Sequence, residues 1–553
     1  MVAKQRAVFL LAGMALGAMC APALADDPMV TKAPAVAAAL YPPAPPPPQA
    51  CTSLPGFFLT DCQLTWYGVR VYGTVDMGGT YQSHGTPFDP NFPTGASYLL
   101  GAGGTGATNR TPGFGLGPNA LSQSVIGISS KEPIAPGWNF VSVNELAFDP
   151  YSLLLANAPM ALYDAKGTAQ NTESLPFDSS RWGWLAGQNA IGVNSATFGT
   201  LTFGRQNALE NDGVVAYDPM GAAYAFSPIG FSGKVAGAGD TEDARWTTAI
   251  KYRVNIGDFR LAIMGQPIGG HSAGLDDYNP NNGAISGDIG GDVKNLGTGV
   301  LSLDAIGTYE RDAVNISMMY PGQVVNAAGY PVTFPASGAN KATLSDQTAF
   351  MALAKYSFGS WSSPPPMVTK GPVVPSGPVG IPLTLYAGYE WIQFASPSDP
   401  QNSFYDDGFA FVDPNALGAA YHGQTASVNL TSINNNAFNA GCGTGGGCKD
   451  EIFQVFWVGG KYGITRDLDF VVAYYEYFQN TYTLNVGNVC AIPAAHSQCA
   501  GNFYVGSGLL DWRFLPKWDA YIGTMYSAAT GGIANADITR NNWATTAGVR
   551  FRF

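Results

Sequence analysis

The chain is poor in charge, in histidine and in long apolar runs. Charged residues make up 12% of its 553 residues, against about 25% in ordinary soluble domains. Basic residues are outnumbered by acidic ones, 27 against 39, whereas nucleic-acid binding demands basic stripes. The composition therefore argues against an ordinary soluble domain and against nucleic acid as a partner.

The only stretch that looks like a targeting segment stands at the start. Lys4 and Arg6 precede an apolar stretch from residue 7 to 19, and Ala23-Leu24-Ala25 follows. This pattern predicts a secretory signal, residues 1–25, that is cleaved after Ala25. The stretch is short for a membrane anchor, and the residues before Cys20 lack the leucine of a lipoprotein signal. Because the signal carries two basic residues and no acids, the mature chain has a net charge of about −14.

Past the signal, no apolar run approaches the ~18 residues of a membrane helix. Apolar and polar residues instead alternate, most clearly from Trp543 to Phe553, where the chain ends on the strand itself. A period of two predicts strands with one apolar and one wet face. Glycine and aromatic residues are abundant as well. The sequence therefore predicts an all-β transmembrane antiparallel barrel spanning residues 64–553.

Sixteen strands are expected, an even number as in single-chain bacterial barrels. They lie near 64–81, 121–131, 138–148, 188–195, 200–206, 244–254, 259–266, 299–310, 313–320, 346–358, 383–394, 451–463, 468–479, 502–514, 518–527 and 542–553. Short turns at 255–258, 311–312, 465–467 and 515–517 alternate with long polar loops. Short turns in such barrels face the periplasm and long loops face outward.

Two Pro-rich segments are expected on the periplasmic side. One is a leader, residues 26–63, and the other is an insertion, residues 360–381, between the tenth and eleventh strands. Pro28-Met29-Val30-Thr31-Lys32-Ala33-Pro34 in the leader is nearly repeated as Pro366-Met367-Val368-Thr369-Lys370-Gly371-Pro372 in the insertion. The two PMVTK strings could dock a periplasmic partner or the cell wall; the alternative is a duplicated spacer.

Six cysteines remain after the signal, in three closely spaced pairs. An even count in an exported chain predicts disulfides. Metal binding is the alternative, although no Cys-x-x-Cys occurs and only His496 lies near a pair. The candidate disulfide residues are Cys51, Cys62, Cys442, Cys448, Cys490 and Cys499.

Several stretches resemble the trimeric, sixteen-stranded general porins of Gram-negative bacteria. The first is Tyr67-Gly68-Val69-Arg70-Val71-Tyr72-Gly73-Thr74-Val75-Asp76, and the second is Ser195-Ala196-Thr197-Phe198-Gly199-Thr200-Leu201-Thr202-Phe203-Gly204-Arg205-Gln206. The terminal Phe553 matches the family's assembly signal, and the Cys51 to Cys62 segment looks like porins of alphaproteobacteria. The second strand lacks the basic lumen residues common in the family, and Asn144 is expected where the third strand often brings a lumen Glu.

This resemblance implies a passive diffusion channel without a cofactor. It implies an outer-membrane location among lipid and lipopolysaccharide, insertion by the barrel assembly machinery, a homotrimer, and a third loop that folds inward to narrow the pore. That loop would run from about 207 to 243, with acids at Glu210, Asp212 and Asp218.

Alternation places basic residues on the opposing lumen wall. Charge on the lipid face would cost ~2–4 kcal/mol at mid-bilayer, so the wet faces of the first, sixth and seventh strands should turn inward. The wall candidates are Arg70, Arg245, Lys251, Arg253 and Arg260. We expect a basic wall facing an acidic loop across the pore; the alternative is that these are ordinary solvated lumen residues.

Further lumen acids are expected at Asp304, Glu310 and Glu390, and the acidic mature chain predicts weak cation preference. Two other functions remain open. A substrate-specific channel would need an inward aromatic row, of which only Tyr72 and Tyr386 are candidates. An outer-membrane hydrolase would need a histidine base, and His84, His271, His422 and His496 all fall in expected loops. Loop acids near 276, 277, 288, 292, 406 and 407 could bind calcium, although such acids are common in turns.

Overall fold

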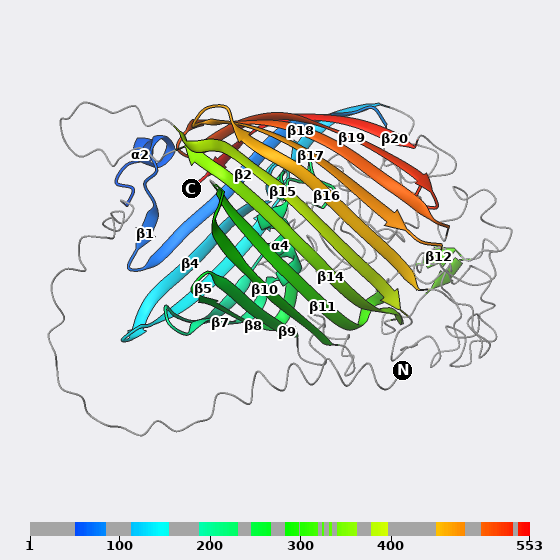
Figure 1. Cartoon of the computed structure of the whole chain (residues 1–553), viewed down its shortest axis with the longest axis horizontal. Coiled ribbons are helices and arrows are strands. Elements are labelled where there is room, and N and C mark those ends of the chain that lie inside the picture. The colour runs from blue at the N-terminus through cyan, green and yellow to red at the C-terminus, as the bar shows by residue number, and fades with distance from the viewer. Residues whose placement is uncertain are drawn as a thin grey trace, which may run out of the picture. The chain divides into compact units, whose positions relative to one another are not determined.

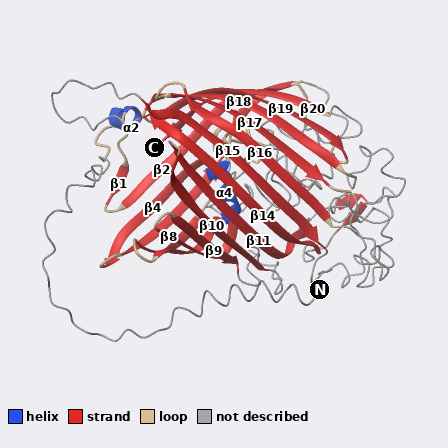
Figure 2. Ribbon diagram, in the orientation of Figure 1, coloured by secondary structure: helices blue, strands red, loops and turns tan. Residues whose placement is uncertain are grey.

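The protein is described here from a computed structural model. It covers residues 50–84, 112–153, 187–229, 245–266, 283–297, 299–318, 323–325, 331–333, 340–361, 378–395, 450–481, 499–534 and 540–553. Both PMVTK strings and the cleavage site at Ala25 lie outside these residues. Most described residues belong to one large antiparallel sheet (Figures 1 and 2).

In the described parts of the chain, two short helices accompany the strands: α2 (Leu54–Leu59) and α4 (Leu209–Tyr217). Neither is long and apolar enough to cross a membrane. The strands are β1 (Leu64–Trp66), β2 (Val69–Gln82), β3 (Gly113–Pro118), β4 (Ser124–Ala135), β5 (Trp138–Phe148), β6 (Asn189–Ser195), β7 (Gly199–Asn207), β8 (Arg245–Ile256), β9 (Phe259–Gln266), β10 (Gly283–Leu296), β11 (Gly299–Met318), β12 (Gln323–Val325), β13 (Pro331–Thr333), β14 (Asn340–Trp361), β15 (Pro378–Ala395), β16 (Glu451–Gly463), β17 (Leu468–Gln479), β18 (Gly501–Leu515), β19 (Trp518–Gly531) and β20 (Asn541–Arg552).

The large sheet closes on itself. Each long strand pairs antiparallel with the next in the chain, and β20 returns to β2, where Arg550 lies opposite Asp76. The sheet has 18 strands, but β3 and β4 both pair with β2 and share one position, and β1 is a short hairpin extension of β2. Sixteen positions therefore surround the barrel, which confirms the predicted sixteen-strand antiparallel fold.

Two errors in the predicted strand list cancel. Strand β10 was expected to be loop, because it is rich in glycine and carries Asp288 and Asp292. Strand β11 runs without a break from Gly299 to Met318, so the turn expected at 311–312 and the separate strand expected at 313–320 are wrong. Because one strand was missed and one was split, the total and the orientation of all later strands stay correct.

The outer face of the barrel is apolar, as a lipid-facing surface requires. Phe203, Ile250, Phe350 and Phe456 are 45%, 43%, 48% and 39% exposed, although they are large and apolar. Their neighbours along each strand turn inward. In β17, for example, every second residue is buried, and the residues between are exposed or half-buried. Hydrocarbon would cover the exposed row, and the other row faces the lumen.

Short turns gather at one end of the barrel, which is the periplasmic end in barrels of this class. Residues 136–137, 257–258 and 516–517 make three of these turns. Strands β14 and β15 meet at the same end, where Trp361 lies opposite Pro378. The predicted insertion, 360–381, is therefore shortened to a connection of 362–377, which lies outside the described residues.

The N-terminal cysteine loop packs on this end. A disulfide joins Cys51 and Cys62 and encloses α2, whose Phe57 ring lies 5.5 Å from that of Phe551 and 5.3 Å from that of Phe553. Cys499 is also disulfide-bonded, and its partner lies outside the described residues. Cys442, Cys448 and Cys490 lie outside them too. Helix α2, within the predicted leader, thus packs against the end of the last strand.

Candidate functional site

One described segment leaves the wall after β7, and we call residues 208–229 the inward segment. It opens with α4, whose first turn carries Glu210 and Asp212; acids are favoured there by the positive end of the helix dipole. The helix ends at Tyr217 because Asp218 precedes Pro219, and a residue before proline avoids the helical region. Asp218 has extended backbone angles, φ −80° and ψ 127°.

The inward segment packs against the wall strands. Helix α4 contacts β9, β10, β11, β14 and β15, and it lies among the strands in Figure 2. Trp457 of β16 donates its indole N–H to the Tyr217 carbonyl at 3.1 Å. Beyond the helix, the Ala225 amide donates to the Ala120 carbonyl at 2.9 Å. The segment therefore touches strands on several sides of the barrel.

Two of the three predicted loop acids are buried against the wall. Glu210 is 1% exposed, and the Ser286 hydroxyl of β10 donates to its Oε1 at 2.6 Å. Burial raises the pKa of the Glu210 carboxyl to about 7. Asp218 is 2% exposed and accepts hydrogen bonds from the Tyr475 hydroxyl at 2.5 Å and the Ala222 amide at 2.8 Å. Burial raises the pKa of Asp218 as well. Both acids anchor the segment.

The third acid, Asp212, touches two of the predicted wall bases directly. Lys251 Nζ lies 2.7 Å from Asp212 Oδ2, and the Arg253 guanidinium pairs with the same oxygen. The Lys251 side chain is 7% exposed and that of Arg253 is 47% exposed. The acidic loop and the basic wall are thus in contact here, whereas the sequence predicted that they would face each other across water.

Arg245 does not continue the inward row of Lys251 and Arg253. The pairing of β7 with β8 shifts register after Gly204, and Thr248 has a left-handed φ of 52°. Such a bulge adds a residue and reverses the alternation beyond it. Trp246, which is 1% exposed and belongs to the buried cluster, takes the inward position. The inward placement predicted for Arg245 is therefore wrong.

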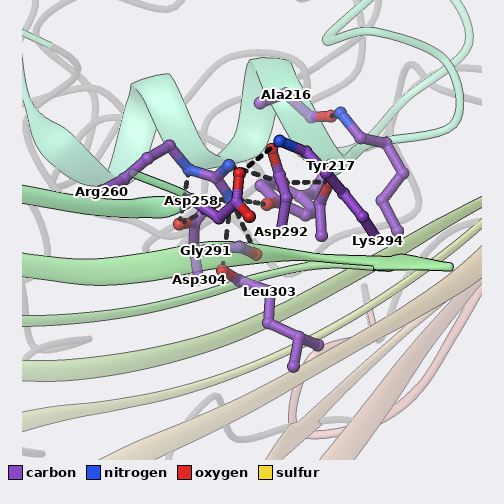
Figure 3. A network of polar contacts seen from close by, with 11 residues as sticks. Ala216, Tyr217, Asp258, Arg260, Gly291, Asp292, Lys294, Leu303 and Asp304 are labelled. Carbon is purple, nitrogen blue, oxygen red and sulfur yellow. Dashed lines mark hydrogen bonds and ion pairs between the residues drawn. The ribbon is translucent and has the colours of Figure 1, made fainter. Parts of the chain in front are cut away.

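Arg260 is the centre of a polar network beneath α4 (Figure 3). Its guanidinium lies 2.6 Å from Asp292 and 3.2 Å from Asp304, and it donates to the Tyr217 hydroxyl at 3.1 Å. Nearby, Lys294 pairs with Asp258 in the turn before β9. Asp292 was expected in a loop, but it lies on β10 and turns inward with Arg260.

On the opposite wall, Arg70 lies over the Tyr72 ring, 5.8 Å from its centroid. The Tyr72 hydroxyl donates to Glu145 Oε1 at 2.8 Å. Glu145 pairs with Gly127, whereas Asn144 pairs with the outward residue Ile128. The expectation that Asn144 fills the lumen position of this strand is therefore wrong by one residue, and a lumen glutamate is present.

The remaining predicted acids lie on inward rows. Glu310 and Glu390 are 0% exposed, and Asp304 binds Arg260. The prediction missed Lys355, whose ammonium donates to the Ala216 carbonyl at 3.2 Å and lies 4.9 Å from the centre of the Tyr217 ring. Alternation along β14 would have found it, because Lys355 shares the parity of Met351 and Leu353. Asp288 was not predicted as a lumen residue, because the glycine-rich sequence of β10 was expected to form a loop.

A pocket of about 560 Å³ lies between α4 and the wall formed by β8 to β11. The turn that joins β6 to β7 forms its periplasmic side, through Asn194, Ser195 and Gly199. Its charged lining residues are Asp212, Arg253, Arg260, Asp288 and Asp304. The pocket therefore brings acids and bases together next to the inward segment.

Comparison with known proteins gave one family match. The model of a family described as Gram-negative porin matches residues 12–363. A search of curated proteins gave no match.

Among solved structures, an anion-selective porin from Comamonas acidovorans is similar at 14% identity and a TM-score of 0.48, covering 88% of this chain and 99% of that one. OmpT of Vibrio cholerae is similar at 12% identity and a TM-score of 0.45, over 89% and 100% of the two chains. OmpF of Salmonella typhi is similar at 10% identity and a TM-score of 0.41, again over 89% and 100%.

Proposed function

Because the chain belongs to the Gram-negative porin family, we propose that its inward segment sets the width of the pore. The barrel is an outer-membrane channel for passive diffusion, and its family and fold are those of a channel rather than an enzyme. We further propose that it has no enzymatic activity and carries small hydrophilic solutes and ions without a cofactor.

One observation supports the narrowing. Inside a closed barrel with an apolar outer face, helix α4 packs against β9, β10, β11, β14 and β15 and pairs with two bases of β8. Val215 of the same helix is 50% exposed. Open water is then left between α4 and the wall of β2 to β7, where Arg70 and Glu145 turn inward. We propose that solutes pass through this space.

The acidic chain should give the channel weak cation preference. The negative net charge of the mature chain enriches cations near the channel, while Arg70 beside the open space opposes that effect. Because Asp212 is neutralised by Lys251 and Arg253, it adds little to the field across the pore, to which Arg70 and Glu145 on the opposite wall contribute charges of opposite sign. We therefore propose that the ion preference is small.

Planar-bilayer recording of the purified full chain tests this function. We expect stable open channels and a reversal potential, measured across a salt gradient, that shows weak cation preference. Absence of conductance would contradict the channel function. Clear anion preference would contradict only the charge argument. Assays for lipase and protease activity on the same sample should give no turnover.

Assembly follows the family likeness. We propose that the mature chain begins after Ala25, that it forms a homotrimer among lipid and lipopolysaccharide, and that Phe553 serves as the signal read by the barrel assembly machinery. In the folded chain, Phe553 exchanges backbone hydrogen bonds with Gly73 at 3.0 and 2.9 Å. Deletion of Phe553 should lower the amount of folded barrel in the membrane, and cross-linking of the intact protein should give a trimer.

We also propose that the two PMVTK strings make contacts in the periplasm. Both would face the periplasm, where they would contact the cell wall or a periplasmic protein; a duplicated spacer remains the alternative. Deleting both strings should reduce the amount of protein that sediments with isolated cell wall. Unchanged sedimentation would favour the spacer.

A further inference from the structure

The pocket beneath α4, here called the α4 pocket, has a size suited to a small solute. Ligand pockets in proteins commonly enclose ~300–1,000 Å³, and this one encloses about 560 Å³. Leu209 and Tyr217 of α4 and Ile306 of β11 supply apolar lining, and Arg253 and Asp288 supply opposite charges. The pocket therefore offers an apolar surface with polar groups of both signs.

The register of the wall places those two charges at one level. Arg253 of β8 lies opposite Ala262 of β9, and Ala262 lies opposite Asp288 of β10. Neighbouring strands are ~4.8 Å apart, so the Cα atoms of Arg253 and Asp288 are about 10 Å apart across two strand spacings. The residue between them has only a methyl side chain. This leaves a hollow with a guanidinium on one side and a carboxylate on the other.

The charges in the pocket differ in how well they are paired. Arg260 is held by Asp292 and Asp304, and Arg253 by Asp212. Asp288 is the exception among these groups, because its Oδ1 is buried and has no hydrogen-bond partner among the described residues. A buried acceptor without a donor is costly and is normally satisfied by a partner, a water molecule or a ligand.

We propose that the α4 pocket binds a small zwitterion, with its ammonium group on Asp288 and its carboxylate on Arg253. An ammonium group supplies the three N–H donors that Asp288 Oδ1 lacks. Arg253 is half exposed, and its guanidinium carries five N–H donors, so it can bind a second carboxylate while it keeps Asp212. The short aliphatic part of the solute would lie over Ala262. This site rests on the proposed channel function, because the solute reaches it through the lumen.

Solute-induced current fluctuations in the reconstituted full chain test the site. The probe is 4-aminobutyrate, compared with butylammonium and butyrate, which each carry one of the two charges. We expect saturable fluctuations with 4-aminobutyrate, weaker ones with butylammonium and the weakest with butyrate. Asp288→Asn should raise the half-saturating concentration of 4-aminobutyrate at least about tenfold, since it removes a charged acceptor.

A matched variant separates this effect from a general loss of charge. Asp467→Asn removes the same charge from an exposed turn at the same end of the barrel, and it should leave the half-saturating concentration unchanged. Ala262→Leu fills the hollow without changing charge and should weaken binding as Asp288→Asn does. Both single-charge probes and both pocket variants can be read even if one variant assembles poorly.

Three results would overturn the proposal. The first is that Asp288→Asn behaves as Asp467→Asn does, and the second is that butyrate binds as well as 4-aminobutyrate. The third is that the wild-type channel conducts normally without any saturable fluctuation. Each of these leaves the channel function standing. If the wild-type chain instead forms no channel at all, the proposed function fails first and the site fails with it.

Discussion

The two halves of the inward segment are held in different ways. Helix α4 buries Leu209, Val214 and Tyr217, and it is also held by charged and polar groups. Asp212 binds Lys251 and Arg253, and Glu210 accepts a hydrogen bond from Ser286. The remainder, residues 219–229, which we call the tail, is fastened mainly by burial. Its buried apolar residues are Met220, Ala223, Tyr224, Ala225, Phe226 and Ile229.

Glycines in the wall receive the tail. A Cβ added to Gly459 of β16 would lie 2.6 Å from Pro219, and one added to Gly523 of β19 would lie 2.6 Å from the Phe226 ring. A side-chain atom at either glycine would clash with the tail, so the position of the tail depends on close packing against these strands. Close packing depends little on salt or pH, whereas charge pairs respond to both. The comparison predicts that the tail sets the resting position and that α4 is the adjustable part.

The largest effect should come from removing the Phe226 side chain, which packs the tail against the wall. Phe226 is 0% exposed, and Phe226→Ala should cost ~3–5 kcal/mol, the usual range for a fully buried phenylalanine. The tail would loosen, so both a higher single-channel conductance and a lower melting temperature in detergent are expected. Val215→Ala, at an exposed position of α4, is the control and should change neither. Equal effects from the two variants would contradict the inference that close packing holds the tail in place.

A smaller effect is expected from Asp212→Asn. This variant leaves Lys251, whose side chain is 7% exposed, without its anion. Removing one partner of a buried pair costs ~3–5 kcal/mol, and the lower end of about 3 kcal/mol applies because Asp212 is 28% exposed.

The freed bases should also shift the reversal potential toward anions. Asp258→Asn, which removes an equal charge from an exposed turn residue, is the control. A shift of the same size in the control would show that net charge alone decides.

The pH dependence of α4 follows from Glu210. Burial raises the pKa of its carboxyl from 4.5 to about 7, so between these two values the folded state holds a proton that the unfolded chain releases. Stability therefore falls as pH rises through this window. The contribution is present in full below pH 4.5, is lost as pH approaches 7, and is on the order of 3 kcal/mol.

Current noise from α4 should accordingly increase from pH 4.5 to 7. Glu210→Gln keeps the neutral form at every pH, so it should remove this dependence. A pH profile that survives in the Gln variant would assign the titration to another group.

The sequence was sufficient for the wall and insufficient for its contacts. A period of two identifies the outward row in β9, for instance Phe259, Leu261 and Ile263, because side chains that face lipid must be apolar. It fails in β10, where glycine and aspartate resemble a loop yet face the lumen, and in β8, where the bulge near Thr248 reverses the row. The lumen tolerates polar, small and charged residues alike, so composition does not mark an inward strand.

The roles of the loop acids could not be read from the chain for a related reason. Glu210, Asp212 and Asp218 look alike in sequence, but they have different partners in the structure. Glu210 accepts from a serine hydroxyl, Asp212 pairs with two bases, and Asp218 accepts from a tyrosine hydroxyl and backbone amides. The partner strands are β10, β8 and β17, which stand far apart in the sequence. Only the closed barrel brings Ser286, Lys251 and Tyr475 to the same segment.

The smallest effect should come from Lys294→Ala, which breaks the pair with Asp258 near the periplasmic turn. Both side chains are exposed, at 58% and 49%, and exposed ion pairs contribute little to stability because water and salt screen them. The free energy of unfolding in detergent should therefore fall only slightly, and salt at about 0.5 M should abolish the difference. Arg260 lies one strand away in the same network and is less exposed, so Arg260→Ala should cost more. If Lys294→Ala proved as costly as Asp212→Asn, burial would not be what separates the two kinds of contact along this wall.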